Sequence, residues 1–144
     1  MAILDKELQD KIDALSENAY EKFQNNEIKE SFNLLEKAWL LYPEPRNQWN
    51  EAYNTAKYSF EDYMKIGDFT NANIWLDRMI DNNSNLHLSD FELEHNEAKY
   101  LFETGDYAKA FEKWKYVVKE AGLRYFEEED SKYKNFYKNK GILK

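Results

Sequence analysis

Cysteine is absent from this chain of 144 residues, and its absence excludes two kinds of structure at once. Neither a disulfide framework nor a thiolate metal site can form, and a chain without disulfides suits a reducing compartment. No apolar stretch approaches the roughly 20 residues that a membrane-spanning helix needs. The first residues lack a basic region followed by an apolar run, so they do not resemble a signal peptide. We therefore expect a soluble, cytoplasmic protein.

Glycine, proline and histidine are also scarce, with four, two and two copies. The glycines are scattered, so the chain has no glycine-rich loop of the kind that binds phosphate. Glu92-x-x-His95 has the spacing of half a di-iron site, but that site needs a second copy and two further carboxylates. His87 has no matching motif, and no serine can be paired with a base from sequence. We expect no metal, no cofactor and no enzymatic activity.

Basic residues are outnumbered, with 20 Lys and Arg against 28 Asp and Glu and a net charge of −8. Such a chain repels the phosphates of DNA and RNA, which argues against nucleic acid as a partner. A negative field speeds the encounter with a basic protein or peptide. The alternative is that the charge serves only to keep a cytoplasmic protein in solution.

Aromatic residues are abundant, at 17% of the chain, and they share a helical spacing with the aliphatic residues. The first apolar stripe has steps of three or four residues: Leu4, Leu8, Ile12, Leu15, Ala19 and Phe23. Such steps place the side chains on one face of a helix. No stretch alternates with a period of two, so we predict an all-α fold. The expected helices span residues 5–24, 27–42, 48–66, 69–80, 89–103, 106–120 and 124–140.

Turn residues divide these helices into pairs. Asn26, Gly67 and Gly105 stand at the tips of three hairpins, because asparagine and glycine tolerate the left-handed backbone that a tight turn needs. The tips are 41 and 38 residues apart, and periods of this length are typical of stacked helix pairs. Ala110, just after the third tip, is small enough to let two helices approach closely.

The boundaries between the pairs have their own signals. Pro43 and Pro45 end the second helix, because proline lacks an amide donor and disfavours helix in the residue before it. Asp81–Asn85 is polar, and we predict a loop there. Ser89 and Glu92 have the form of a capping box that opens the next helix.

A short motif recurs at two of the hairpin tips. Gly67–Ala72 reads GDF-x-x-A and Gly105–Ala110 reads GDY-x-x-A, which resembles the turn and second-helix start of a tetratricopeptide (TPR) repeat. The first hairpin carries the second-helix pattern of that family and its closing proline: Ile28, Ser31, Leu35, Ala38 and Pro43. The chain thus resembles a divergent TPR-like helical repeat protein, with HEAT-like or other helical hairpins as the alternative.

The resemblance implies a right-handed solenoid that forms a single domain over residues 1–144. Its hairpins would span about 5–42, 46–82 and 88–121, followed by a capping helix at about 124–140. A cap is expected because the last repeat of such an array needs a polar outer face.

In TPR proteins the first helix of each hairpin lines a concave surface. The resemblance therefore implies partner contacts from Tyr20, Asn54, Lys57, Glu61, Lys65, Glu92, His95 and Lys99. The same rows include Asp13, Ser16, Gln24 and Glu103. Because these rows mix charges, they do not resemble the Lys/Arg clamp that some TPR proteins use for C-terminal carboxylates. Tyr20 and His95 are suited to be contact anchors, as aromatic residues often are, although Tyr20 has the alternative of packing against the next helix.

The third helix carries more aromatic residues than one core can take. Trp49, Tyr53 and Tyr58 point in different directions at 100° per residue, so at least one is expected to be partly exposed. An exposed ring on a charged surface is a candidate contact point.

These observations favour a non-catalytic module that binds another protein, expected to be basic. The more specific hypothesis is a small acidic inhibitor of the immunity-protein kind, which binds a cognate toxin and blocks its site. The alternative is a TPR-type scaffold or co-chaperone-like adaptor that reads short peptides. Self-association remains open, and neither nucleic acid nor membrane is expected as a partner.

Overall fold

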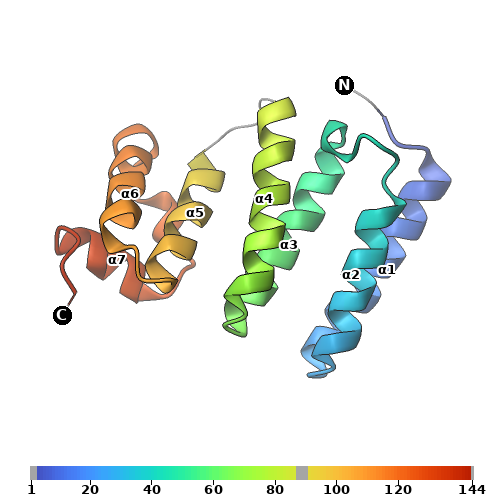
Figure 1. The fold of residues 1–144 in the computed structure, drawn as a ribbon, viewed down its shortest axis with the longest axis horizontal. Helices are drawn as coiled ribbons and strands as arrows, with labels where there is room; N and C mark the ends of the chain where they lie inside the picture. Colours follow the sequence, from blue (N-terminus) through green and yellow to red (C-terminus); the bar gives the residue numbers. More distant parts are fainter. Residues whose placement is uncertain (1–2, 87–90, 144) are drawn as a thin grey trace. The chain divides into compact units, whose positions relative to one another are not determined.

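The computed structural model describes residues 3–86 and 91–143. In this part of the chain the structure is all-α, with seven α-helices packed against their neighbours, two short 3-10 helices and no strand. The chain divides into two compact units, residues 1–87 and 88–144, and each is described by itself. No helix among the described residues is both long enough and apolar enough to cross a membrane. Figure 1 labels the helices of each unit and colours them along the sequence.

Unit 1 consists of two antiparallel hairpins (Figure 1). The first pairs α1 (Lys6–Gln24) with α2 (Ile28–Leu41), and the second pairs α3 (Asn50–Lys65) with α4 (Phe69–Leu86). At the tips Asn26 and Gly67 have φ of 61° and 75°, the left-handed conformation expected there. The predicted turns of unit 1 are confirmed.

A buried hydroxyl fixes the two helices of the first hairpin. Ser31 on α2 is fully buried, and its Oγ donates a hydrogen bond of 2.6 Å to the carbonyl oxygen of Ala19 on α1. Because Ala19 has only a methyl group, the two backbones approach closely enough for this bond to form. The remaining core of the hairpin is apolar, with Ile12, Leu35 and Ala38 buried.

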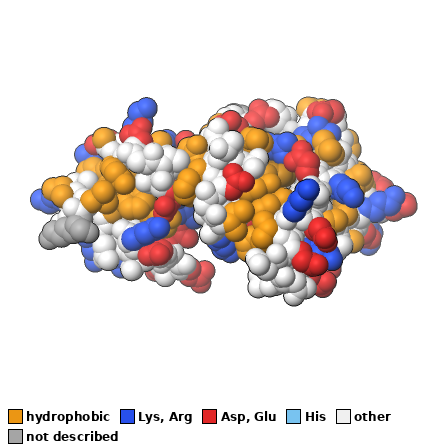
Figure 2. Space-filling view, turned by 60° about the horizontal axis from the view of Figure 1, so that its bottom comes forward, with side chains coloured by type: hydrophobic (Ala, Val, Ile, Leu, Met, Phe, Trp, Pro, Cys, Tyr) orange, Lys and Arg blue, Asp and Glu red, His pale blue; other side chains and the backbone are white. Residues whose placement is uncertain are grey.

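The two hairpins of unit 1 are joined through aromatic rings. Phe32 on α2 stacks on Tyr63 on α3 with ring centroids 3.6 Å apart. Arg78 on α4 forms a two-pronged pair with Glu36 on α2, at 2.8 and 3.0 Å. The guanidinium of Arg78 also lies 4.9 Å from the ring centre of Trp39 and 4.3 Å from that of Trp75. On the face that Figure 2 presents, hydrophobic side chains of unit 1 lie beside charged ones.

The polar loop predicted at Asp81–Asn85 is wrong, because α4 continues as a helix to Leu86. The extra turn packs on a 3-10 helix, η1 (Arg46–Gln48), that precedes α3. Asn82 is buried and its Nδ2 donates to the carbonyl oxygen of Trp49 at 3.0 Å. Asn85 donates to the carbonyl oxygen of Asn47 at 3.0 Å. The asparagines thus hold the helix by long-range bonds rather than ending it.

Unit 2 contains α5 (Phe91–Glu103), α6 (Tyr107–Ala121), a 3-10 helix η2 (Arg124–Phe126) and α7 (Ser131–Lys138). The hairpin of α5 and α6 turns at Gly105, with φ of 92°, and Ala110 is fully buried as predicted. Ser89, the predicted capping residue, lies outside the described residues. Trp114 is at the centre of an aromatic core, within ring contact of Phe102, Phe126, Tyr133 and Phe136.

The continuous capping helix predicted for 124–140 is wrong. The segment is broken into η2, a turn and α7, which begins at Ser131. Asp130 accepts a hydrogen bond from the backbone N–H of Lys132 at 2.9 Å, and this cap starts the helix. The break allows both Phe126 and Phe136 to reach Trp114.

The architecture is compatible with a helical repeat. The all-α prediction is confirmed, and the hairpins pair α1 with α2, α3 with α4 and α5 with α6. The right-handed TPR-like solenoid and the single domain stay predictions.

Replacing Arg78 with lysine tests the contact between α2 and α4. We expect Arg78→Lys to lower the free energy of unfolding by about 1 kcal/mol, because an ammonium keeps the charge but loses both the fork to Glu36 and the stacking on two indoles. The measurement is denaturant unfolding followed by tryptophan fluorescence. Arg124→Lys, at an exposed position of unit 2 where the guanidinium contacts the neighbouring Tyr125, is the matched control and should leave stability nearly unchanged. Equal effects of the two changes would contradict the assignment.

Candidate binding groove

A groove of about 560 Å³ runs between α1 and α3 in unit 1. The first helices of the two hairpins supply its walls, and α2 with the residue after it supplies part of its base. The lining residues are Gln9, Ile12, Asp13, Ser16, Ala19, Tyr20, Leu35, Tyr42, Glu51, Asn54, Thr55, Tyr58, Glu61, Asp62 and Lys65. On α3 they recur every three or four residues, which places them on one face of the helix.

The base of the groove is largely apolar and buried. Ile12, Ala19 and Leu35 are buried there. Tyr42, at the end of α2, is 2% exposed, and its hydroxyl lies 3.0 Å from the Oγ1 of Thr55 on α3. Burial, together with the nearby carboxylates of Glu51 and Asp13, raises the pKa of Tyr42 to about 12. The hydroxyl therefore stays protonated and links the two hairpins beneath the groove.

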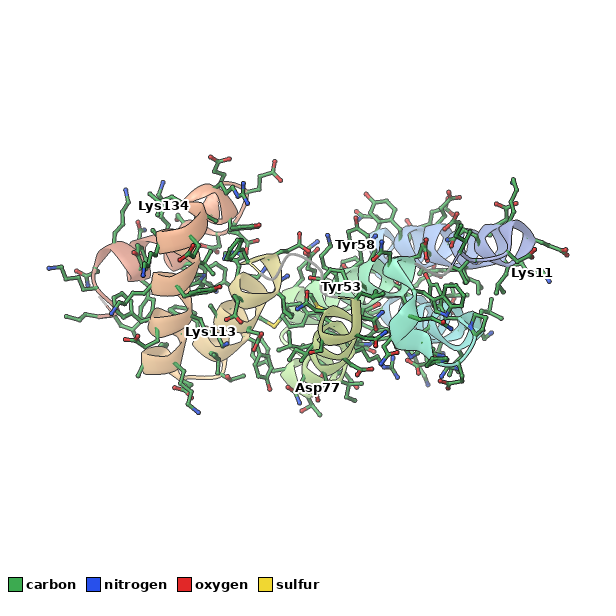
Figure 3. The ribbon with its side chains drawn as sticks, turned by 90° about the horizontal axis from the view of Figure 1, so that it is seen from above. Lys11, Tyr53, Tyr58, Asp77, Lys113 and Lys134 are labelled. Carbon is green, nitrogen blue, oxygen red and sulfur yellow. The ribbon has the colours of Figure 1, made fainter. Side chains whose placement is uncertain are left out.

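Two tyrosines stand exposed among the lining residues. Tyr20 on α1 is 66% exposed and Tyr58 on α3 is 57% exposed, although both are large aromatic residues. In Figure 3, Tyr58 extends on the side of unit 1 where α1 lies, whereas Asp77 lies on the opposite side. The expectation that one ring of the third helix is exposed is confirmed, because Trp49 and Tyr53 are buried and Tyr58 is not.

The lining of the groove is acidic. It includes four carboxylates and a single ammonium, that of Lys65. The Lys65 ammonium is 4.0 Å from Asp62, and the Lys65 side chain is two-thirds exposed. Burial raises the pKa of Asp62 to about 6, with Lys65 opposing this rise and Glu61 adding to it. At neutral pH the lining therefore contains more negative than positive groups.

Two side chains of the lining, those of Gln9 and Glu51, each have a buried acceptor atom without a donor among the described residues. Gln9 donates through Nε2 to Asp13 at 2.8 Å, which leaves its Oε1 as a buried acceptor without a hydrogen-bond partner among the described residues. The Oε2 of Glu51 is buried and unpaired within the same part of the chain. Buried polar atoms normally have a partner, so two unpaired acceptors in one groove are unusual.

The structure brings together half of the residues predicted as partner contacts. Tyr20, Asn54, Glu61 and Lys65 all line the groove. Tyr20 is 66% exposed, so most of its side chain is not covered by a neighbouring helix. Lys57 is not in the lining, and its ammonium lies 5.1 Å from the centre of the Tyr58 ring. The role of these residues as contacts stays a prediction.

The remaining predicted contacts lie in unit 2, where two of them are covered. His95 is 4% exposed and Lys99 is 8% exposed, so neither forms an open surface of α5. Both bind Glu129, which follows η2: His95 Nε2 and Lys99 Nζ lie 3.0 and 2.7 Å from its Oε2. Glu92, the third predicted contact on α5, is half-buried. The placement of His95 and Lys99 on an exposed concave surface is therefore corrected.

The side chains that cover His95 and Lys99 on α5 form a connected network of hydrogen bonds and ring contacts. Trp114 Nε1 donates to His95 Nδ1 at 3.0 Å, so His95 carries its proton on Nε2 and donates it to Glu129. The rings of Tyr125 and Phe126 lie 5.7 and 5.5 Å from the His95 ring. Burial opposes ionisation of Glu129, but the bonds from His95 and the charge of Lys99 lower its pKa to about 2.

Sequence reasoning missed several groove residues, notably Glu51, Thr55 and Asp62. A signal for them was present, because 51, 55, 58, 62 and 65 form one helical face. The predicted face was centred one residue away from it and included Lys57 instead. No three His, Asp or Glu side chains in the described part of the chain are grouped so as to hold a metal ion.

Comparison of the chain with protein-family models, with curated proteins and with solved structures finds no match. The resemblance to TPR repeats therefore stays a prediction, carried by the two turn motifs and the hairpin pattern.

The raised pKa of Asp62 predicts an unusual pH response of unit 1. A carboxyl with a folded pKa near 6 and an unfolded pKa of about 3.9 binds more protons when folded, so stability rises as the pH falls through 6. We expect the wild type to gain about 1 kcal/mol between pH 7 and pH 5 relative to Asp62→Asn, measured by denaturant unfolding. Asp77→Asn, an exposed change on α4, should retain the gain. A wild type and an Asp62→Asn variant with parallel pH profiles would contradict the assignment.

The lowered pKa of Glu129 predicts that the stability of unit 2 changes with pH in the opposite direction. Glu129→Gln leaves the buried Lys99 without its carboxylate, and we expect a loss of about 3 kcal/mol, read as faster hydrogen exchange in α5 and α6. Glu128→Gln removes the same charge from an exposed neighbour and should change little. Because the pKa of Glu129 is lowered to about 2, its contribution is complete above the unfolded pKa of about 4.3 and disappears as the pH falls from there to 2. Protection that is unaffected by Glu129→Gln would refute this role.

Proposed function

We propose that the chain is a non-catalytic protein-binding module that contacts its partner through the groove between α1 and α3. The observation that carries the proposal is the combination of two exposed tyrosines with an acidic lining around one cavity. Tyrosine supplies a large contact area at a low cost in conformational entropy, and it is common among residues that dominate binding energy. The buried base, with its hydrogen bond between Tyr42 and Thr55, also supports the proposal, because a preformed site loses less entropy on binding.

The size of the groove bears on the kind of partner. A cavity of about 560 Å³ holds a few side chains. A stable interface between two folded proteins buries roughly 800 Å² on each side, so a folded partner must also contact residues outside the groove. The groove is then the centre of the contact and the charged surface around it the rim.

The acidic charge favours one version of this function. A net charge of −8 speeds the approach of a basic protein, and the effect falls with salt. We propose a small inhibitor of the immunity type, which binds a cognate basic toxin and blocks its site. The second candidate is an adaptor that reads short peptides, and the modest groove volume favours it because a few side chains suffice to fill the site.

The proposal predicts a partner that depends on the two tyrosines. The tagged chain is used for affinity capture from its native lysate at low and high salt, together with the double variant Tyr20→Ser/Tyr58→Ser. We expect the wild type to hold a protein that the double variant loses by at least tenfold, since two exposed anchors contribute more than about 1.4 kcal/mol together. Mass spectrometry identifies the protein and its stoichiometry.

Ile74→Ser is the matched control, because Ile74 is an exposed apolar residue of α4 outside the groove lining. It should capture the partner as the wild type does. One basic protein at equal stoichiometry supports the inhibitor, whereas several proteins that share a short motif support the adaptor. A partner retained by the double variant, or lost equally with Ile74→Ser, would overturn the groove as the contact surface.

A further inference from the structure

We propose that the groove recognises an arginine or lysine side chain presented by a segment of the partner protein. This inference rests on the proposed function and specifies the chemistry that the groove selects. Four features of the lining carry it: its charge, its unpaired acceptors, its exposed rings and its apolar base.

Charge is the first feature. Asp13 from α1 and Glu51, Glu61 and Asp62 from α3 face the same cavity, so carboxylates approach it from both walls. Near Asp62 the counter-charge is the ammonium of Lys65, which is 4.0 Å from the Asp62 carboxylate and belongs to a largely exposed side chain. Exposed ion pairs of this kind contribute little, so an incoming cation with better geometry displaces Lys65 at low cost.

The acceptors of the lining favour a ligand that donates hydrogen bonds over one that accepts them. The Oε1 of Gln9 and the Oε2 of Glu51 are buried acceptors without a donor among the described residues. Guanidinium has five N–H donors and ammonium three, and neither has an acceptor. An acidic or purely carbonyl ligand would bring further acceptors to a lining whose charged groups are mainly carboxylates, so the lining selects against such ligands as well as for cations.

The tyrosine rings and the apolar base of the groove offer contacts to the other parts of a lysine or arginine side chain. Tyr58 already has the ammonium of Lys57 at 5.1 Å from its ring centre, so its ring accepts cations within the chain itself. Tyr20, 66% exposed on the opposite wall, offers a second ring. The aliphatic stem of lysine or arginine packs on Ile12, Ala19 and Leu35, while its charged end remains among the carboxylates.

The test uses blocked pentapeptides with glycine at every position except the third, which is arginine, lysine or citrulline. Citrulline has the shape of arginine without its charge. Each peptide is titrated into the isotope-labelled full chain and followed by backbone amide NMR. We expect the arginine and lysine peptides to shift amides of α1 and α3 in a saturable way, with a dissociation constant of about 1 mM. The citrulline peptide should bind at least tenfold more weakly.

The double variant Glu51→Gln/Asp62→Asn should weaken the arginine peptide at least tenfold, because it removes two charges while keeping the shape of the lining. The matched control, Asp77→Asn, removes a charge from the opposite side of unit 1 (Figure 3) and should bind as the wild type does. The amide spectrum of each variant also reports whether it is folded. Loss of binding in a variant with a native spectrum supports the proposal.

Three results would overturn it: equal binding of the arginine and citrulline peptides, shifts confined to residues outside α1 and α3, or no saturable shift with any peptide. These results are distinguishable from failure of the proposed function. If the captured protein still requires Tyr20 and Tyr58 while the peptides show no preference for charge, the groove binds a protein but does not recognise a cation. If the Tyr20→Ser/Tyr58→Ser variant also captures the protein as the wild type does, both proposals are contradicted.

Discussion

The separation of α1 from α3 depends on how the chain passes from the first hairpin to the second. The buried hydroxyl of Tyr42, at the end of α2, is bonded to Thr55 in the middle of α3. A few residues further on, the indole N–H of Trp49 donates to the carbonyl oxygen of Pro43 at 2.8 Å. Arg46 donates to the carbonyl oxygens of Trp39 and Leu40 at the end of α2. These bonds fix α3 relative to α2, and the groove is the space that results beside α1.

The segment between α2 and α3 is held in turn by α4. This gives the asparagine-rich end of α4 a structural role. Asn82 and Asn85 bind carbonyl oxygens of the η1 segment and of the start of α3. Peptide groups outside regular helix would otherwise need water or other partners. The last turn of α4 thus satisfies the segment that holds the groove open. This dependence links a polar sequence that contains no obvious core residue to the geometry of the proposed binding surface.

The helices and turns followed from the sequence because their causes are local. Stripes of apolar residues define the helical faces, and Asn26, Gly67 and Gly105 permit the turns. The extension of α4 and the break before α7 did not follow, because each depends on residues distant in the chain. Asn82 bonds to Trp49, 33 residues earlier, and Phe126 is drawn to Trp114 across the α6 terminus.

The predicted site residues also fall into two groups, those placed by local helical spacing and those whose surroundings depend on distant residues. Tyr20, Asn54, Glu61 and Lys65 were predicted because a helical face is readable from spacing alone. The covering of His95 and Lys99 was not readable, since their partner, Glu129, is 34 residues after His95. A charged side chain in a sequence is ordinarily assigned to the surface. Here a counter-charge that is distant in the sequence offsets the desolvation cost of burying it.

The carboxylates of Asp62 in unit 1 and Glu129 in unit 2 have opposite surroundings, and this contrast bears on the cation binding proposed for unit 1. In unit 2 the carboxylate of Glu129 has both a histidine and an ammonium within 3.0 Å, and its pKa falls to about 2. In unit 1 the pKa of Asp62 rises to about 6, and an oxygen of Glu51 has no donor in the described chain. The arrangement in unit 1 does not favour folding at neutral pH, because burial disfavours the ionised form of the Asp62 carboxylate. A cation supplied by another molecule would reverse that cost, so the destabilising feature of the free chain becomes a source of affinity and of selectivity in the complex.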